Sequence, residues 1–83
     1  MNFTEHTKIR KEKFGTVLFD TLTEKIFITD RIGGEILQLI KQRKDLPQVV
    51  SELSEAFEGD RQIIEKDVIE FTNQLKSNNI IGA

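Results

Sequence analysis

The feature that most restricts how this chain can fold is a pair of strand-like runs followed by sequence with a helical pattern to the end. The runs are residues 15–20 (GTVLFD) and residues 25–29 (KIFIT), and the polar segment between them has turn chemistry. No strand-like run follows residue 29, so the second run has no later strand to cover it. The pattern predicts a small hairpin sheet against a helical layer, with one uncovered strand edge where another chain can bind.

Charge pattern and capping residues predict the remaining elements. Residues 8–14 alternate weakly and are heavily charged, which predicts a short solvated edge strand. Asp30 is a good helix N-cap and predicts a first helix from about Arg31 to Arg43. A capping box formed by Asp45 and Gln48, with a proline between them, opens a second helix.

A third helix follows a glycine stop and begins after its own N-cap, Asp60. It ends near Asn78-Asn79, and Ile80-Ile81 return the tail to the core. Apolar residues recur at helical spacing along the three helices, namely Ile32, Ile36, Leu37 and Ile40; Val49, Val50, Leu53, Ala56 and Phe57; and Ile64, Val68, Phe71 and Leu75. The predicted fold class is α+β, a three-stranded antiparallel sheet followed by three helices in a winged-helix-like arrangement.

The length of 83 residues is enough for one small domain and too short for two. We expect a flexible N-terminus over residues 1–7 and a single domain over residues 8–83. A domain this small buries only roughly 60–65% of the surface of its unfolded chain, so its core leaves little room for a catalytic cavity. Size therefore favours a binding module over an enzyme.

Composition excludes several classes of protein. The absence of cysteine excludes disulfides, thiolate zinc sites and iron–sulfur clusters, and in so small a domain it favours a cytoplasmic location. No apolar run approaches the length of about 20 residues that crosses a bilayer. A net charge of −2 gives no electrostatic reason to approach nucleic acid or an anionic membrane, and we expect neither as a partner.

No residue pattern predicts catalysis, a metal site or a cofactor. His6 is the only histidine and has no neighbouring ligand to complete a metal site. The carboxylates of the third predicted helix alternate with Lys66 and indicate an ordinary solvated face. Gly33-Gly34 lacks the spacing of a phosphate loop and indicates close packing of the first helix against the preceding strand. We therefore expect no enzyme.

Nucleic-acid binding by a winged helix is the alternative hypothesis. Two basic clusters would contact phosphates in that case, namely Lys8, Arg10, Lys11 and Lys13, and Lys41, Arg43 and Lys44. The third helix would enter the groove, but residues 60–70 carry Asp60, Glu65, Asp67 and Glu70 against Arg61 and Lys66, which is the wrong balance for a duplex.

The favoured hypothesis is peptide binding by strand addition. The edge of residues 25–29 offers unpaired N–H and C=O groups, and the third helix supplies apolar pockets for alternate side chains. The simpler interpretation is that the apolar residues of both elements form the core, and some of them must do so in either case. A homodimer through the same strand edge is a further hypothesis.

The order and spacing of these segments resemble the PqqD family, small peptide chaperones whose fold is also called the RiPP recognition element. The matching segments are residues 13–20, 26–30, 33–37, 49–53, 57, 64–71, 75 and 79–81, which cover nearly the whole chain from about residue 8. The resemblance implies that the leader of a ribosomally made precursor peptide binds along the third strand and against the third helix. The chaperone would then present the precursor to a modifying enzyme, often a radical S-adenosylmethionine enzyme, with no chemistry of its own.

Carried over to this sequence, the resemblance implies a peptide-binding site on the third strand and the third helix. Its residues are Lys25, Ile26, Phe27, Ile28, Thr29, Arg61, Ile64, Asp67, Val68 and Phe71. Arg61 would lie near the mouth of the groove, where it can meet a leader carboxylate. The whole strand is included because a one-residue slip of register exchanges its two faces.

Two segments depart from the members of the family that serve pyrroloquinoline quinone synthesis. Those members tend to carry a Leu-Leu-Tyr-Pro-Glu-like stretch before the third strand and a Cys-Asp-Gly-like turn after the first helix. The corresponding places here read Thr23-Glu24-Lys25 and Arg43-Lys44-Asp45. We therefore expect a different peptide natural product.

Overall fold

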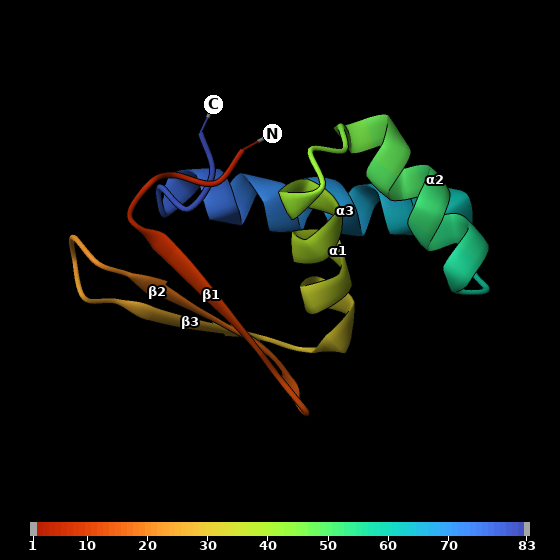
Figure 1. The fold of residues 1–83 in the computed structure, drawn as a ribbon. Coiled ribbons are helices and arrows are strands. Elements are labelled where there is room, and N and C mark those ends of the chain that lie inside the picture. The colour runs from red at the N-terminus through yellow and green to blue at the C-terminus, as the bar shows by residue number, and fades with distance from the viewer. Residues whose placement is uncertain (1, 83) are drawn as a thin grey trace.

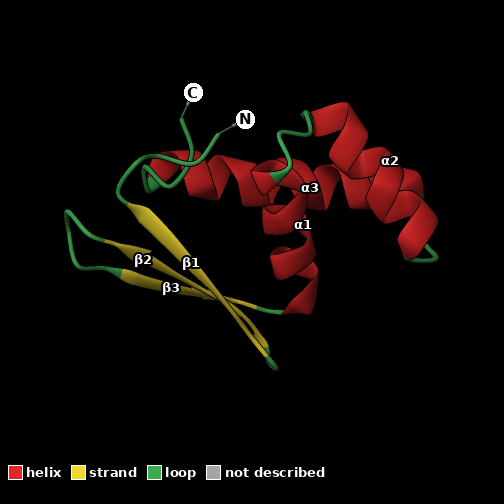
Figure 2. Cartoon of the chain, viewed as in Figure 1, coloured by secondary structure: helices red, strands yellow, loops and turns green. Residues whose placement is uncertain are grey.

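The structure, a computed structural model, describes residues 2–82. Met1, in the predicted flexible N-terminus of residues 1–7, and Ala83, in the predicted domain of residues 8–83, lie outside the described residues. Strands β1 (Thr7–Glu12), β2 (Gly15–Asp20) and β3 (Ile26–Thr29) form an antiparallel sheet in the order β1-β2-β3. Helices α1 (Arg31–Lys41), α2 (Leu46–Ala56) and α3 (Arg61–Ser77) follow (Figures 1 and 2). The predicted α+β fold and its order of elements are confirmed.

The three predicted helix caps form. The carboxylate of Asp30 accepts the backbone N–H of Gly33 at 2.8 Å, and that of Asp60 accepts the N–H of Gln62 at 2.8 Å. Asp45 and Gln48 exchange side chain and backbone hydrogen bonds as a complete capping box. These local signals fix where each helix begins.

Several element boundaries differ from the prediction. β1 runs from Thr7 to Glu12, and Lys13 and Phe14, expected in the strand, form the turn after it. The first helix ends at Lys41, two residues before the expected Arg43, because Arg43 adopts a positive φ of 63°. The N–H of the next residue, Lys44, then bonds back to the carbonyl of Leu39 at 3.1 Å, which closes the helix with a left-handed turn. β3 begins at Ile26, and Lys25 belongs to the hairpin turn before it.

The sheet lies on one side of the molecule, and α1 stands beside it (Figure 1). Helix α3 runs past α1, from α2 on the far side to the chain termini on the side of the sheet. The ends of the chain meet: Phe3 forms a β-bridge with Ile81, and the N–H of Thr4 donates to the carbonyl of Ile80 at 3.0 Å. These contacts involve the N-terminal segment that the sequence predicts to be flexible. No helix within residues 2–82 is both long and apolar enough to span a membrane.

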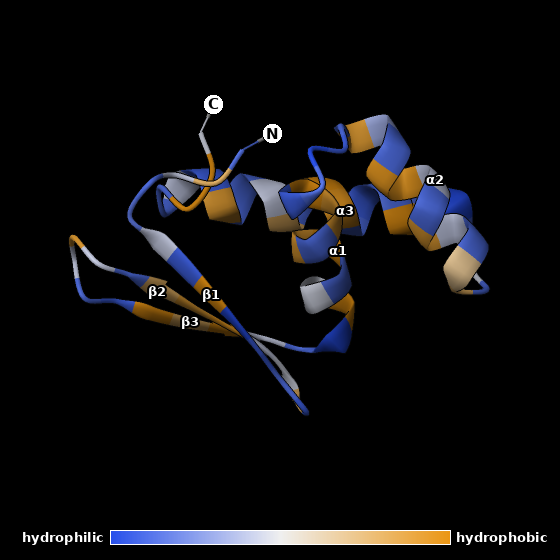
Figure 3. Cartoon of the chain, viewed as in Figure 1, coloured by the Kyte–Doolittle hydropathy of each residue, from blue (hydrophilic) through white to orange (hydrophobic). Residues whose placement is uncertain are grey.

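One core joins the sheet to all three helices, and apolar residues gather where the helices meet (Figure 3). Its buried members are Leu18, Ile36, Leu37, Ile40, Val49, Val50, Leu53, Val68, Leu75, Ile80 and Ile81. The predicted return of the tail to the core is confirmed. Ile32 and Phe57 were expected on apolar faces but are exposed, since Ile32 lies in the first turn of α1 and Phe57 has extended backbone at the end of α2.

Gly33 and Gly34 bring α1 close to the sheet, and the contact of Gly33 with the preceding strand, β3, is the one that the sequence predicts. A Cβ atom on Gly33 would lie 2.9 Å from Cβ of Thr29 on β3. A Cβ atom on Gly34 would lie 2.6 Å from Oγ1 of Thr16 on β2. Both distances are shorter than a side chain tolerates, so the helix can approach the strands this closely only without side chains at these positions.

Candidate functional site

The main chain of β3 presents free hydrogen-bonding groups at two of its residues. The N–H of Asp20 donates to the carbonyl of Lys25 at 3.0 Å, which marks a hydrogen-bonded pair where the β2–β3 ladder begins. Such pairs alternate with non-hydrogen-bonded pairs in an antiparallel ladder, so Ile26 and Ile28 belong to the second kind. Their N–H and C=O groups point away from β2, toward an edge that no strand within residues 2–82 covers.

The side chains of β3 divide between the two faces of the sheet. Phe27 and Thr29 are half-buried and pair with buried residues of β2, so they face the helices. Ile26 and Ile28 face the other way and are 62% and 66% exposed. An added strand would therefore bond to the main chain of Ile26 and Ile28, with Phe27 and Thr29 on its helix-facing side.

An open hollow of about 380 Å³ separates β3 from α3, and we call it the β3–α3 hollow. Its lining residues come from β3, the start of α1 and α3, and they are Ile28, Thr29, Asp30, Ile32, Gly33, Asp67 and Phe71. The carboxylate of Asp30 is already bonded to the backbone of its own helix. Asp67 makes no ion pair or side-chain hydrogen bond with residues 2–82, so the hollow combines apolar walls with an available carboxylate.

The β3–α3 hollow unites part of the predicted site. The predicted residues that line it are Ile28, Thr29, Asp67 and Phe71. The sequence missed Asp30, which is the N-cap of α1, and Ile32 and Gly33, which lie in its first turn. The sequence signal that could have pointed to them is their position immediately after the end of the free strand.

The other predicted residues of α3 lie elsewhere. Val68 is only 1% exposed and belongs to the core. Ile64 is half-buried against the core near Gly59. The guanidinium of Arg61 donates to Oγ of Ser51 on α2 at 3.1 Å, so its side chain is held toward α2.

The remaining strand residues surround the free edge without lining the hollow. Lys25 is exposed in the turn before β3, Ile26 lies on the outer face of the sheet, and Phe27 packs partly against the core. Within residues 2–82, no group of three or more His, Cys, Asp or Glu side chains is placed to hold a metal.

Residues 15–81 match the sequence model of a protein family described as Coenzyme PQQ synthesis protein D (PqqD). The chain belongs to the PqqD family. A relative of this PqqD-family chain, the PqqA binding protein of Gluconobacter oxydans (strain 621H), is 21% identical to it over 81 residues. The alignment covers 98% of this chain and 84% of the relative.

Two solved structures have the same fold as this PqqD-family chain. "TbiB1 in Complex with the TbiA(beta) Leader Peptide" superimposes with a TM-score of 0.91 at 21% identity, over 96% of this chain and 93% of that chain. "Lasso peptide synthetase B1 complexed with the leader peptide" gives a TM-score of 0.86 at 19% identity, over 94% and 92% of the two chains. The fold that the sequence resemblance implied is confirmed.

Proposed function

We propose that this protein binds the leader segment of a ribosomally made precursor peptide by strand addition to β3. The observation that carries the proposal is the free main-chain edge at Ile26 and Ile28 beside the β3–α3 hollow. Membership in the PqqD family supports it, as do a relative named for binding PqqA and two structures of the same fold titled as leader-peptide complexes.

The edge and the hollow supply different parts of the affinity. A β-strand that adds to β3 would exchange hydrogen bonds with the N–H and C=O groups of Ile26 and Ile28, each with a net value of about 0.5–1.5 kcal/mol. These bonds are offset by the cost of ordering the peptide, so β3, with only four residues, does not provide enough affinity by itself. Apolar leader side chains placed against Ile32 and Phe71 provide the rest and the selectivity.

The charge of the β3–α3 hollow indicates what the leader carries. Its charged lining residues are Asp30 and Asp67, and no lysine, arginine or histidine lines it. A leader with a basic side chain next to its apolar anchor would form a charge-assisted contact with Asp67. An acidic residue at the same place would meet an uncompensated carboxylate and bind more weakly.

The protein then presents the bound precursor to a modifying enzyme, for which a radical S-adenosylmethionine enzyme is the proposed class. The role requires no catalytic step on this chain, and the family resemblance is its support. Since the precursor is made on the ribosome, we place the encounter in the cytoplasm.

The test is an amide chemical-shift titration of the labelled protein with the leader of a short precursor encoded beside its gene. We expect shifts at Ile26–Thr29, at the first turn of α1 and at Asp67–Phe71. The control is the same leader carrying N-methyl groups on alternate amides, which blocks strand pairing and should abolish the shifts. Shifts confined to other surfaces, or none at millimolar leader, would overturn strand addition.

A salt-sensitive gel shift with duplex DNA would instead support the alternative hypothesis of nucleic-acid binding.

A second copy of the chain is the competing occupant of the same edge. Two β3 strands pairing in antiparallel fashion would form a continuous sheet and a homodimer. Light scattering with and without leader distinguishes the cases, because a leader that takes the edge converts such a dimer to a monomer. If the mass stays that of a monomer in both conditions, the homodimer hypothesis is rejected.

A further inference from the structure

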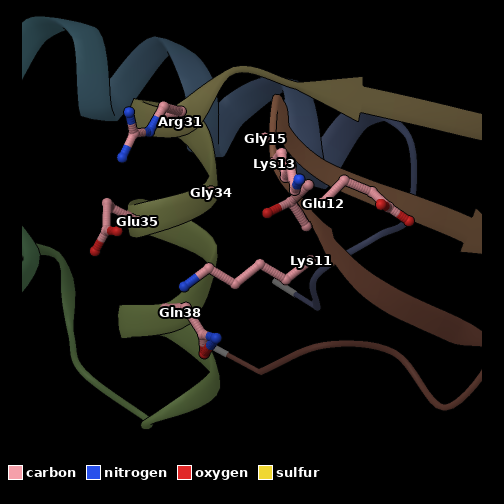
Figure 4. Close-up of a pocket in the computed structure, with 9 residues that line it drawn as sticks. Lys11, Glu12, Lys13, Gly15, Arg31, Gly34, Glu35 and Gln38 are labelled. Atoms are coloured by element: carbon pink, nitrogen blue, oxygen red, sulfur yellow. The ribbon is translucent and has the colours of Figure 1, made fainter.

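A second hollow, of about 360 Å³, lies between the β1–β2 turn and α1 (Figure 4). Its lining residues are Lys11, Glu12, Lys13, Gly15, Thr16, Arg31, Gly34, Glu35 and Gln38. Figure 4 shows the side chain of Lys11 reaching from β1 toward Gln38 on α1. We call this feature the basic hollow.

The basic hollow has more cationic than anionic lining residues, whereas the chain as a whole has a net charge of −2. Three cationic side chains line it, Lys11, Lys13 and Arg31, and none of them has an ion-pair partner within residues 2–82. Of its two carboxylates, Glu12 is paired with Arg10 outside the lining. The basic hollow therefore has cationic groups available to an anionic ligand.

Protection of an edge strand is the simpler explanation of basic residues on β1, since lysines discourage unwanted strand pairing. It accounts for Lys8 and Arg10, whose partners Phe19 and Val17 lie on the outer face of the sheet. Lys11 differs, because strand alternation places its side chain on the face toward the helices. There it also lines a narrow crevice together with Lys41, so a second helical cation is close by.

The basic hollow and the β3–α3 hollow share no lining residue. They nevertheless meet at the start of α1, where Arg31 lines the first and its neighbour Ile32 lines the second. A ligand in the basic hollow would lie next to a strand-added leader without displacing it.

We propose that the basic hollow is a second binding site, which takes an acidic segment of the modifying enzyme while the leader occupies β3. This inference rests on the proposed function and adds the surface by which the enzyme is recognised. A carboxylate of that segment would contact Lys11, Lys13 and Arg31, and Glu35 would accept a backbone N–H or a basic side chain from the same segment. The contact brings the enzyme next to the leader site, at the start of α1.

The lining favours an acidic peptide over nucleic acid. A duplex carries phosphates along its whole length, so the cations that bind it are spread along an open surface. Here the three cations line one concavity together with the carboxylate of Glu35, so they do not form the extended positive row that a duplex requires. A peptide segment has both acceptors and donors and can match such a mixed lining.

The test is an amide chemical-shift titration of the full chain with a capped peptide of alternating glutamate and alanine. We expect saturable shifts at Lys11, Arg31, Glu35 and Gln38, and none with the corresponding lysine–alanine peptide. The matched variants are Lys11→Glu and Lys8→Glu, which make the same charge change on the two faces of one strand. Lys11→Glu should weaken binding about tenfold or more, and Lys8→Glu by less than about twofold at ~0.15 M salt, where charges beyond about 8 Å are screened.

Equal effects of the two variants would overturn the proposal, because they would indicate diffuse attraction to β1. The proposal would also be overturned by shifts that map elsewhere, by no shifts at millimolar peptide, or by a stronger response to a short DNA duplex than to the acidic peptide.

Leader titrations separate this inference from the proposed function. Lys11→Glu should bind leader as the unmodified chain does, and leader should not compete with the acidic peptide. Competition would mean that the basic hollow belongs to the leader itself and would exclude the enzyme as its occupant.

Discussion

The ring of Phe71 on α3 closes over Gly33 on α1, so that a Cβ atom on Gly33 would lie only 3.3 Å from Cζ of the ring. The same Cβ atom would lie 2.9 Å from Cβ of Thr29 on β3. One missing side chain thus lets a strand and two helices meet at a point in the wall of the β3–α3 hollow. The shape of the proposed leader site depends on this glycine.

Gly33→Ala should reduce leader affinity about tenfold, because the added methyl group pushes Phe71 and Thr29 out of position in a tightly packed wall. The free energy of unfolding should change by less than about 1 kcal/mol, since the better helix propensity of alanine offsets part of the strain. Isothermal titration with leader and urea unfolding measure the two effects. The matched control is Gly59→Ala, where the nearest atom is Cδ1 of Ile64 at an ordinary 3.7 Å. Unchanged leader affinity in Gly33→Ala would contradict the assignment of the hollow.

Ile28→Pro should abolish leader binding while the domain stays folded. Proline removes a backbone N–H that points to the free edge, and it is tolerated in edge strands when that N–H does not serve the ladder. Ile28→Ala is the control, because it shortens the side chain and keeps the N–H. We expect Ile28→Ala to bind leader within about threefold of the unmodified chain, since main-chain bonds supply much of the affinity in strand addition. Binding that survives the proline would rule out pairing at this residue.

The sequence predicted well what local chemistry determines. Asp30, Asp45 and Asp60 each cap a helix as expected, because an N-cap is a bond between residues two or three positions apart. The uncovered third strand was also predictable, since it follows from the order of elements along the chain. The paired glycines predicted close packing of α1 against the preceding strand. Gly33 makes that contact with β3, and Gly34 packs against β2.

The residues that make up the site were harder to predict, because they depend on how elements far apart in the sequence pack against one another. Val68 and Phe71 belong to one apolar stripe of α3, yet Val68 is buried in the core and Phe71 lines the hollow. Periodicity identifies the stripe and does not say which of its residues another element covers. Arg61 was expected near the mouth of the groove, but its guanidinium donates a hydrogen bond to the hydroxyl of Ser51 on α2. Ile32 shares the helical spacing of the apolar residues Ile36, Leu37 and Ile40, yet in the first turn of α1 it is 52% exposed.

Gly34→Ala should lower the free energy of unfolding by about 1–2 kcal/mol. The added Cβ atom would lie 2.6 Å from Oγ1 of the buried Thr16, and the overpacking destabilises the fold by more than the better helix propensity of alanine stabilises it. A second substitution at Thr16 tests this cause. Thr16→Ala removes the clashing atom, so the double variant should be more stable than the sum of the single effects predicts. Thr16→Val keeps a methyl group at that place and should give no such recovery. Additive effects in both double variants, measured by urea unfolding, would show that the clash is not the reason.

Asp20 links the hairpin turn to the N-terminal segment. Its Oδ1 accepts the backbone N–H groups of Leu22 at 2.9 Å and Thr23 at 3.3 Å, and its Oδ2 lies 3.8 Å from Nε2 of His6. Burial by itself raises the pKa of this carboxyl, but the hydrogen bonds from Leu22 and Thr23 and the charge of His6 together hold the pKa below its ordinary value of 3.8. The ionised carboxylate is therefore favoured more in the folded chain than in the unfolded one.

Asp20→Asn should for this reason destabilise the domain at neutral pH and have progressively less effect in acid. A carboxyl whose pKa is lowered by folding stabilises the fold fully above its unfolded pKa, and that contribution is lost as the pH falls through the folded pKa. Asparagine keeps an oxygen that can accept the two turn hydrogen bonds and removes only the charge, so the comparison isolates ionisation. Urea unfolding of both chains between about pH 7 and pH 2 should give a difference that is present at neutral pH and shrinks as the pH falls below the ordinary pKa of 3.8. A difference that stays the same across this range would mean that the asparagine disturbs the turn itself, and that the carboxylate charge does not stabilise it.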